Sequence, residues 1–152
     1  MVRLADLGPH GGFLAGMEMP KYEPSPLVAA PRLAETRVAL ISTAGLHRAD
    51  DRPFPPGATD YRIIPGDIDF ADLRLSHISV NFDRSGFQQD ANVMFPLERL
   101  RELSSMGEIA SVARWHYSFM GATDPGQLEE TAADVAARLT DDGVTAALLV
   151  PV

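Results

Sequence analysis

Four histidines are the side chains of this 152-residue sequence best suited to proton transfer or ligand binding: His10, His47, His77 and His116. An imidazole changes its charge near neutral pH and can also bind metal. No two of them are four residues apart, and neither an HExxH nor a GxSxG motif occurs. The chain has no cysteine, which removes disulfides, thiolate metal sites and the commonest redox nucleophile.

His47 ends the predicted turn at residues 43–47 (TAGLH), which directly follows an apolar run. Gly45 within this turn permits a positive φ or a close backbone approach. At such a position His47 could act as a general acid or bind a carboxylate. It could equally serve only to cap the loop, and the sequence leaves both alternatives open.

His77 precedes a polar segment that contains Asn81, Asp83, Asp90 and Asn92. Imidazole and oxygen ligands of this kind could hold a divalent cation. Loops rich in serine, asparagine and aspartate are also ordinary turn chemistry. We therefore predict no metal site here.

The segment 115–121 (WHYSFMG) is the densest aromatic stretch of the chain. It could form a core or interface cluster in which His116 and Tyr117 find hydrogen-bond partners. Alternatively, it could form the apolar wall of a pocket for a small substrate. No glycine-rich phosphate loop is present, because residues 43–45 contain a single glycine.

These residues must be positioned by strands and helices that the sequence pattern predicts. Residues 37–43 (RVALIST) and 144–150 (VTAALLV) are apolar runs typical of strands buried on both faces of a parallel sheet. Residues 61–65 (YRIIP) and 73–78 (LRLSHI) are shorter strand candidates.

Two helices are also expected. The first begins at Pro96, places apolar side chains at positions 97, 100, 103 and 106, and ends at Gly107. The second begins with Asp124 as its cap and Pro125 in its first turn, and ends at Gly143. Its apolar positions 128, 132, 135 and 139 share one face.

Strands that alternate with helices in this way predict an α/β fold with three layers and a mostly parallel sheet, a flavodoxin-like or Rossmann-like half-domain. Ligand sites in such sheets lie at the carboxyl ends of the strands. We expect the α/β domain to span residues 37–152. Residues 1–36, which are interrupted by glycines and prolines, are expected to form an irregular arm.

A formal net charge of -8 argues against a nucleic-acid partner or an anionic membrane surface. No apolar stretch approaches the roughly 18 residues of a membrane span, and no signal-peptide pattern occurs. We therefore expect a cytoplasmic protein.

Several segments, taken in order, resemble one known family. They are residues 38–47 (VALISTAGLH), 61–65 (YRIIP), 76–77 (SH), 90–103 (DANVMFPLERLREL), 107–121 (GEIASVARWHYSFMG) and 142–152 (DGVTAALLVPV). The series resembles the selenoprotein B family of glycine, betaine, sarcosine and D-proline reductases, in particular its proline-reductase-like branch. The resemblance covers about residues 26–152, and FPLERLREL followed by HYSFMG is its most specific part.

In that family the strand that corresponds to residues 146–152 leads into a selenocysteine or cysteine, which cleaves a bond at a substrate carbon reductively. The resemblance thus implies that the redox residue would follow Val152, as if a selenocysteine codon had been read as stop or the gene were split. The 152 residues would then contain no catalytic residue and be inactive alone. Selenocysteine or cysteine is the only cofactor-like group implied.

By the resemblance and the strand ends together, the residues expected to line a substrate pocket are Thr43, Gly45, His47, His77, Asp90, Asn92, His116 and Tyr117. The segment after Ser76-His77 departs from the family pattern, which weakens any metal or acid–base role for that loop. The expected partners are a small-molecule substrate and either a second copy or a complementing reductase subunit. The alternatives are a non-catalytic binding module and, less favoured, a small metal-dependent hydrolase that uses His77 and Asp90.

A strand at the end of a half-built sheet leaves an unpaired edge and exposed apolar area. We therefore predict that the isolated chain self-associates or is only marginally stable.

Overall fold

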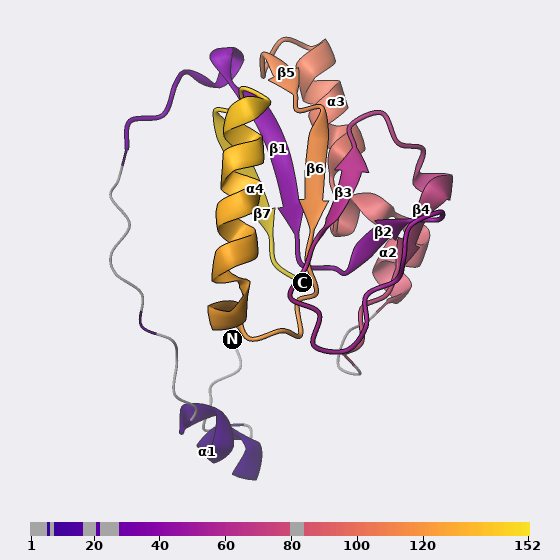
Figure 1. The fold of residues 1–152 in the computed structure, drawn as a ribbon, viewed down its shortest axis with the longest axis vertical. Helices are drawn as coiled ribbons and strands as arrows, with labels where there is room; N and C mark the ends of the chain where they lie inside the picture. The colour runs from indigo at the N-terminus through magenta and orange to yellow at the C-terminus, as the bar shows by residue number, and fades with distance from the viewer. Residues whose placement is uncertain (1–5, 7, 17–20, 22–27, 80–83) are drawn as a thin grey trace.

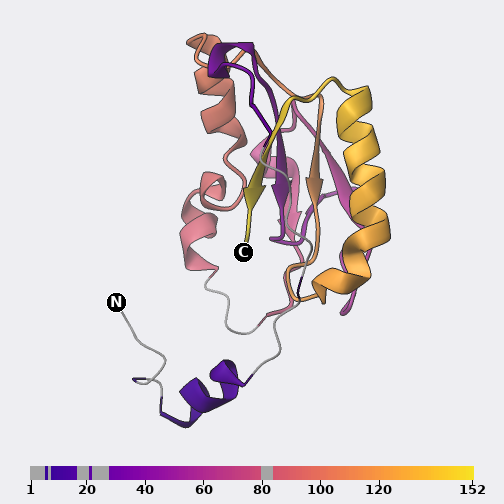
Figure 2. The same ribbon diagram turned by 90° about the vertical axis from the view of Figure 1, so that its left-hand side faces the viewer.

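The computed structural model describes residues 6, 8–16, 21, 28–79 and 84–152. It is an α/β structure in which one curled, mostly parallel sheet lies between two helical layers, as Figures 1 and 2 show from perpendicular directions. The α/β class predicted from the sequence is therefore confirmed. Within the expected irregular arm, residues Pro9–Ala15 form a short helix, α1, which lies away from the sheet in both views.

Strand β1 (Arg37–Ser42) is the centre of the sheet, and every strand that pairs with it is parallel to it. On one side it pairs with β7 (Ala146–Val150) along its length. On the other side, β5 (Ser111–Val112) pairs with the beginning of β1 and β6 (Trp115–Ser118) pairs with its end. Strand β3 (Arg62–Pro65) adds an antiparallel edge next to β6.

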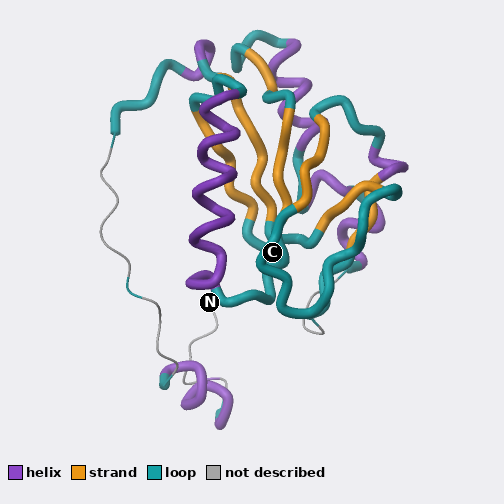
Figure 3. The backbone as a smooth tube through the Cα atoms, in the orientation of Figure 1, coloured by secondary structure: helices purple, strands orange, loops and turns teal. Residues whose placement is uncertain are grey.

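A second, two-stranded sheet consists of β2 (Leu46–Arg48) and β4 (Leu73–Leu75), which are antiparallel. The strand predicted at 73–78 is thus shorter than expected and lies outside the main sheet. Its residues Leu73 and Leu75 still pack against the main core. The tube in Figure 3 follows the chain through this small sheet beside the large one.

Helix α3 (Leu97–Ser105) covers one face of the sheet and α4 (Glu129–Asp141) covers the other. Alternation along β1 separates the two cores, because successive side chains of a strand point to opposite faces. Val38 and Leu40 pack with Phe95, Leu97 and Leu100 on the α3 side. On the α4 side the core is formed by Tyr117, Phe119 and Val135, with Ile41, Leu128 and Leu139 packed against it.

The ends of both helices agree with the sequence prediction. Gly107 and Gly143 adopt φ of 74° and 67°, and each donates its N–H to a carbonyl of the last turn. These left-handed conformations favour glycine and stop the helices. The Asp124 side chain caps the 3-10 turn η5 (Pro125–Leu128), which leads into α4.

The remaining short elements connect these parts. They are the 3-10 turns η2 (Leu33–Glu35), η3 (Phe70–Asp72) and η4 (Ala91–Val93) and the five-residue helix α2 (Ser85–Gln89).

Two sequence expectations need correction. The run 144–150 does form a strand, but β7 is a sheet edge with β1 as its only partner among the described strands, and Leu148 and Leu149 are 42% and 65% exposed. An apolar run shows that a strand can be buried, not that another strand is present to cover it. In addition, the segment 115–121 contains β6, a central strand that the sequence pattern did not predict.

Asp142, just after α4, ties that helix to the beginning of two strands. It accepts hydrogen bonds from the Arg37 guanidinium (2.7 Å) and from the N–H groups of Arg114 (2.7 Å) and Trp115 (3.3 Å). Burial acts to raise the pKa of Asp142, but these donors outweigh it, so the pKa lies below its ordinary value.

We expect Asp142→Ala to lower the free energy of unfolding by about 2 kcal/mol, because three donors lose their acceptor. The neighbouring Asp141 is exposed, and Asp141→Ala should change it by less than about 0.5 kcal/mol. Urea unfolding of both variants measures the difference. Equal effects would show that the acceptor role of Asp142 is not what matters.

Candidate functional site

The carboxyl ends of β1, β6 and β7 converge at one point of the sheet. Thr43, directly after β1, donates its N–H to the Val150 carbonyl (3.2 Å). Its hydroxyl accepts the Val152 N–H (2.8 Å) and lies 3.3 Å from the Val152 carbonyl oxygen. This edge is where ligand sites of parallel α/β sheets are found.

Gly121, the third residue after β6, lies against this point. A Cβ at this position would lie 2.6 Å from the Val152 carbonyl oxygen, 2.7 Å from that of Thr43 and 3.2 Å from Nε2 of His77. Two of these neighbours are main-chain atoms that cannot turn away. Glycine is therefore required at position 121 by close packing of three main-chain segments.

Gly45 holds the turn after β1 in place. It adopts a φ of 68°, donates its N–H to the Phe119 carbonyl (2.9 Å) and accepts from the Ser76 N–H (2.9 Å). A Cβ at position 45 would lie 3.1 Å from the main-chain nitrogen of His77. The turn therefore connects the ends of β1 and β6 to the segment that carries His77.

His77 is buried at this convergence. Its Nδ1 accepts the Ser79 N–H (3.2 Å), which leaves the ring proton of the neutral form on Nε2, the atom nearest to Gly121. Burial lowers the pKa of His77, the Arg84 guanidinium lowers it further, and a hydrogen bond to the backbone of Val152 acts in the opposite direction. His77 is thus a neutral hydrogen-bond donor near neutral pH.

His47 is occupied within its own loop. Its Nδ1 lies 2.8 Å from the Arg48 carbonyl oxygen, which can only accept, so Nδ1 carries the proton. Its Nε2 then accepts from the Ser76 hydroxyl at 2.7 Å. Both ring nitrogens are used, which favours the loop-capping alternative over a general acid.

His116 and Tyr117 point to opposite faces of β6. His116 is fully buried on the α3 side, where its Nδ1 accepts the Leu40 N–H of β1 (2.9 Å) and its ring meets Phe95 edge-on. Tyr117 lies in the α4-side core, edge-on to Tyr61. The core alternative therefore describes both side chains better than the pocket wall.

Asp90 and Asn92 serve a local turn. The Asp90 carboxylate accepts from the N–H (2.9 Å) and the side-chain amide (2.8 Å) of Asn92, and these bonds lower the pKa of Asp90. Asn92 in turn hydrogen-bonds Glu98 at the start of α3. No group of metal-ligating side chains is assembled in the ranges the structure covers, and Asn81 and Asp83 lie outside them. No observation favours the hydrolase alternative.

The structure thus brings together Thr43, Gly45 and His77 from the predicted pocket, and adds Gly121 and the backbone of Val152. Sequence reasoning missed Gly121, although a glycine just after an aromatic stretch was a usable signal. We call this group the carboxyl-edge site.

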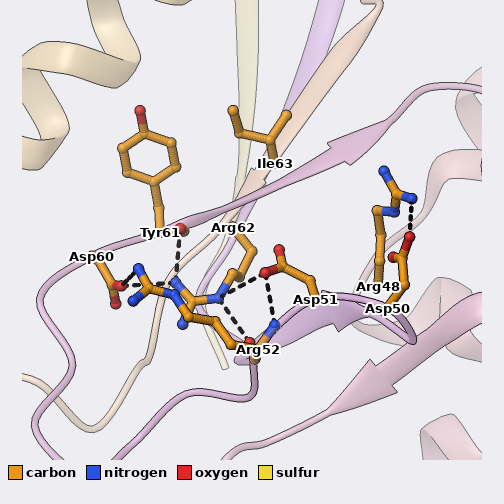
Figure 4. A pocket seen from close by; sticks show the side chains of 8 residues that line it. All are labelled: Arg48, Asp50, Asp51, Arg52, Asp60, Tyr61, Arg62 and Ile63. Carbon is orange, nitrogen blue, oxygen red and sulfur yellow. Dashed lines mark hydrogen bonds and ion pairs between the residues drawn. The ribbon is translucent and has the colours of Figure 1, made fainter.

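A separate cavity of about 560 Å³ lies beside β3, and Figure 4 shows its lining residues. Arg62, only 3% exposed, is at its centre and pairs with Asp60 (2.9 Å). Its guanidinium also donates to the carbonyls of Arg52, Pro53 and Tyr61 and lies over the Phe54 ring at 4.2 Å. Arg62 therefore fixes the 50–60 loop, and the charges around it are already paired.

Comparison with known proteins identifies the family. Residues 10–152 match the family described as glycine/sarcosine/betaine reductase selenoprotein B, so the chain belongs to that family. The resemblance inferred from the sequence is confirmed.

Two curated relatives refine this placement. One is D-proline reductase subunit gamma of Acetoanaerobium sticklandii, 35% identical over 77% of this chain and 49% of the relative, which supports the proline-reductase-like branch. The other is sarcosine reductase complex component B subunit beta of Peptoclostridium acidaminophilum, 28% identical over 86% of this chain and 31% of the relative. The chain thus spans about half the length of the first and about a third of the second. No solved structure matches it.

A search of the described helices finds none that is both long and apolar enough to cross a bilayer.

Proposed function

We propose that this chain forms the substrate-binding α/β portion of a reductase component that cleaves a small amino acid or amine by means of a selenol or thiol. The family membership supports this function, and the carboxyl-edge site supports its location. The selenol or thiol must come from outside these 152 residues, because they contain no cysteine.

The geometry suits a reacting group that lies next to the end of β7. The main chain at Val152 is held by Thr43 and packed against Gly121, so a group beside it would be placed reproducibly. A selenolate or thiolate is the attacking form of such a group. His77 carries its proton on Nε2, and it can donate to that anion or to a substrate carboxylate by exchanging its hydrogen bond to the backbone of Val152 for the new one.

The division of roles follows from these contacts. His77 orients and stabilises a negative charge, while Thr43 and Gly121 position the backbone. The bond at the substrate carbon breaks, and the two electrons come from the selenol or thiol together with a second thiol, also from outside these residues, which combine into a selenosulfide or disulfide. The two protons that they release complete the new bonds at the separated atoms.

Ligand binding to the isolated chain tests this location. D-Proline, sarcosine and betaine are titrated in turn while amide and imidazole NMR signals are recorded. We expect one of them to shift the signals of Thr43, His77 and Gly121, and His77→Leu to weaken binding at least tenfold. Shifts confined to the cavity around Arg62, or no shifts with any of the three, would contradict the proposal.

Gly121→Ala is the sharpest single change at this site. Its added methyl group must displace the carbonyl of Val152 or Thr43, so we expect binding to be lost and the free energy of unfolding to fall by about 1–3 kcal/mol. Gly86→Ala is the control, since a Cβ there meets nothing within 4 Å. Unchanged binding in Gly121→Ala would place the ligand elsewhere.

A further inference from the structure

Strand β7 is the last strand on one side of the main sheet, as far as the described residues show. Among the described strands it pairs with β1 alone, and its residues Ala146–Val150 carry no charge. Natural sheets protect a free edge with lysine, proline, a bulge or a covering loop. The five residues of β7 contain none of these side chains, so this edge is suited to accept another strand.

The two exposed leucines of β7 lie on opposite faces of the sheet. Leu148 is in register with Leu40, which belongs to the α3-side core, and Leu149 is in register with Ile41, which packs on the α4 side. They are 42% and 65% exposed. A strand that is apolar on both faces is typical of the interior of a parallel sheet that has helices on either side.

Helix α4 continues this apolar surface on its own face of the sheet. Asp134 and Arg138 contact Tyr61 next to β3, which places that flank of α4 toward the β3 side. Ala132 and Ala136 are two residues from Asp134 in either direction, about 200° around the helix, and are therefore on the opposite flank. Both alanines are exposed, as is Ala147 of β7.

We call Ala132, Ala136, Ala147, Leu148 and Leu149 the β7 surface. The small side chains of Ala132 and Ala136 on α4 would let a neighbouring helix approach closely, and the free edge of β7 would pair with a strand. A strand added in the parallel direction requires a crossover segment of a dozen or more residues, which is usually a helix. The surface therefore matches one β–α unit that carries apolar residues on both faces of its strand.

We propose that a β–α unit of this kind binds to the β7 surface. The unit belongs to a reductase polypeptide that corresponds to the half of D-proline reductase subunit gamma that this chain does not match. That relative is about twice as long as the matched stretch, so a polypeptide of suitable size exists in this family. A second copy of this chain suits the surface less well. Two copies related by a two-fold axis would pair β7 antiparallel, and each carries a formal net charge of -8.

The test uses two polypeptides: this chain and the unmatched half of the Acetoanaerobium sticklandii subunit, produced separately. Sedimentation velocity should show a 1:1 complex, and hydrogen exchange should show new protection of the β7 amides. Leu149→Glu and Leu148→Glu should each weaken the complex at least tenfold. Val93→Glu and Met106→Glu, at residues 64% and 65% exposed elsewhere, should leave it unchanged.

Three results would overturn the proposal: no complex, a complex that tolerates both leucine substitutions, or a stable homodimer with protected β7 amides that the added polypeptide does not dissociate. Circular dichroism of each variant checks that it is folded. Leu149→Glu is expected to disturb folding less than Leu148→Glu, because Leu149 is the more exposed of the two leucines. The proposed docking depends on the family to which the chain belongs and not on which substrate it binds. Leu149→Glu should therefore still bind the ligand at the carboxyl-edge site, which separates failure of this proposal from failure of the proposed function.

Discussion

Replacing Arg62 with methionine should lower the free energy of unfolding by about 3 kcal/mol, because three main-chain acceptors lose their donor. The guanidinium is 3% exposed and donates to the main-chain carbonyls of Arg52, Pro53 and Tyr61. Methionine preserves much of the volume but leaves these acceptors without their donor and Asp60 without its buried partner. Each lost bond of this kind costs about 1 kcal/mol or more, and the lost ion pair adds little, because Asp60 is 39% exposed and still pairs with Arg52 at 2.7 Å.

Arg52→Met is the matched control for this prediction. Arg52 pairs with the same carboxylate, Asp60, at 2.7 Å, but its side chain is 74% exposed. An exposed pair of this kind contributes about 0–1 kcal/mol. Urea unfolding at neutral pH compares the two variants. A difference of less than about 0.5 kcal/mol between them would mean that Arg62 does not hold the 50–60 loop as the contacts indicate.

Acidification from pH 6.5 to pH 4 should destabilise the protein by about 3 kcal/mol through His116 alone. Burial, and then the Arg101 guanidinium, lower the pKa of His116 to about 4, with a smaller opposing contribution from Asp142. In the unfolded chain the pKa returns to its ordinary value of 6.5. Between these values the unfolded chain binds a proton that the folded chain does not, so stability falls as the pH falls. Above pH 6.5 His116 is neutral in both the folded and the unfolded chain, so its full contribution to stability is present. Each pH unit between the two pKa values corresponds to about 1.4 kcal/mol of the free energy of unfolding.

The physical cause is the bond that His116 makes to β1. Nδ1 accepts the Leu40 N–H, and protonation would turn this acceptor into a second donor facing the same N–H group. His116→Asn places a side-chain oxygen at a comparable position and cannot titrate, so its stability should lack this loss between pH 6.5 and 4. His116→Leu removes the acceptor and should be destabilised at every pH. Equal pH slopes for the wild type and His116→Asn would refute the assignment.

Much of the scaffold could be predicted from the sequence, because a periodic pattern of apolar residues indicates a helix or strand that packs one face against the core. Of the predicted helix face, Leu128, Val135 and Leu139 do pack against the sheet, whereas Ala132 is exposed. Strand β6 was missed because it has no alternating pattern: His116, Tyr117 and Ser118 are all buried, and two of them are polar. Their burial depends on partners from distant segments, such as Leu40 and Leu46, which donate to His116 and Ser118.

The candidate site was predicted only in part for a related reason. Thr43 and Gly45 follow a recognisable strand, so the rule for strand ends in parallel sheets locates them. Gly121 is distinctive only through the carbonyls of Thr43 and Val152, which come from other strands. Asp90 and Asn92 carry side chains that suit a ligand, but three-dimensional placement shows that they cap a turn. Residue type alone does not separate these two uses.

The central position of β1 has a consequence for the synthesis of the chain. Residues 37–42 leave the ribosome early, yet their sheet neighbours are residues 111–118 and 146–150. Pairings between such distant segments form slowly and expose apolar strands while they are incomplete. The nascent chain must therefore keep the VALI run of β1 soluble until Val150 has been translated, so we expect chaperone binding to this run during translation.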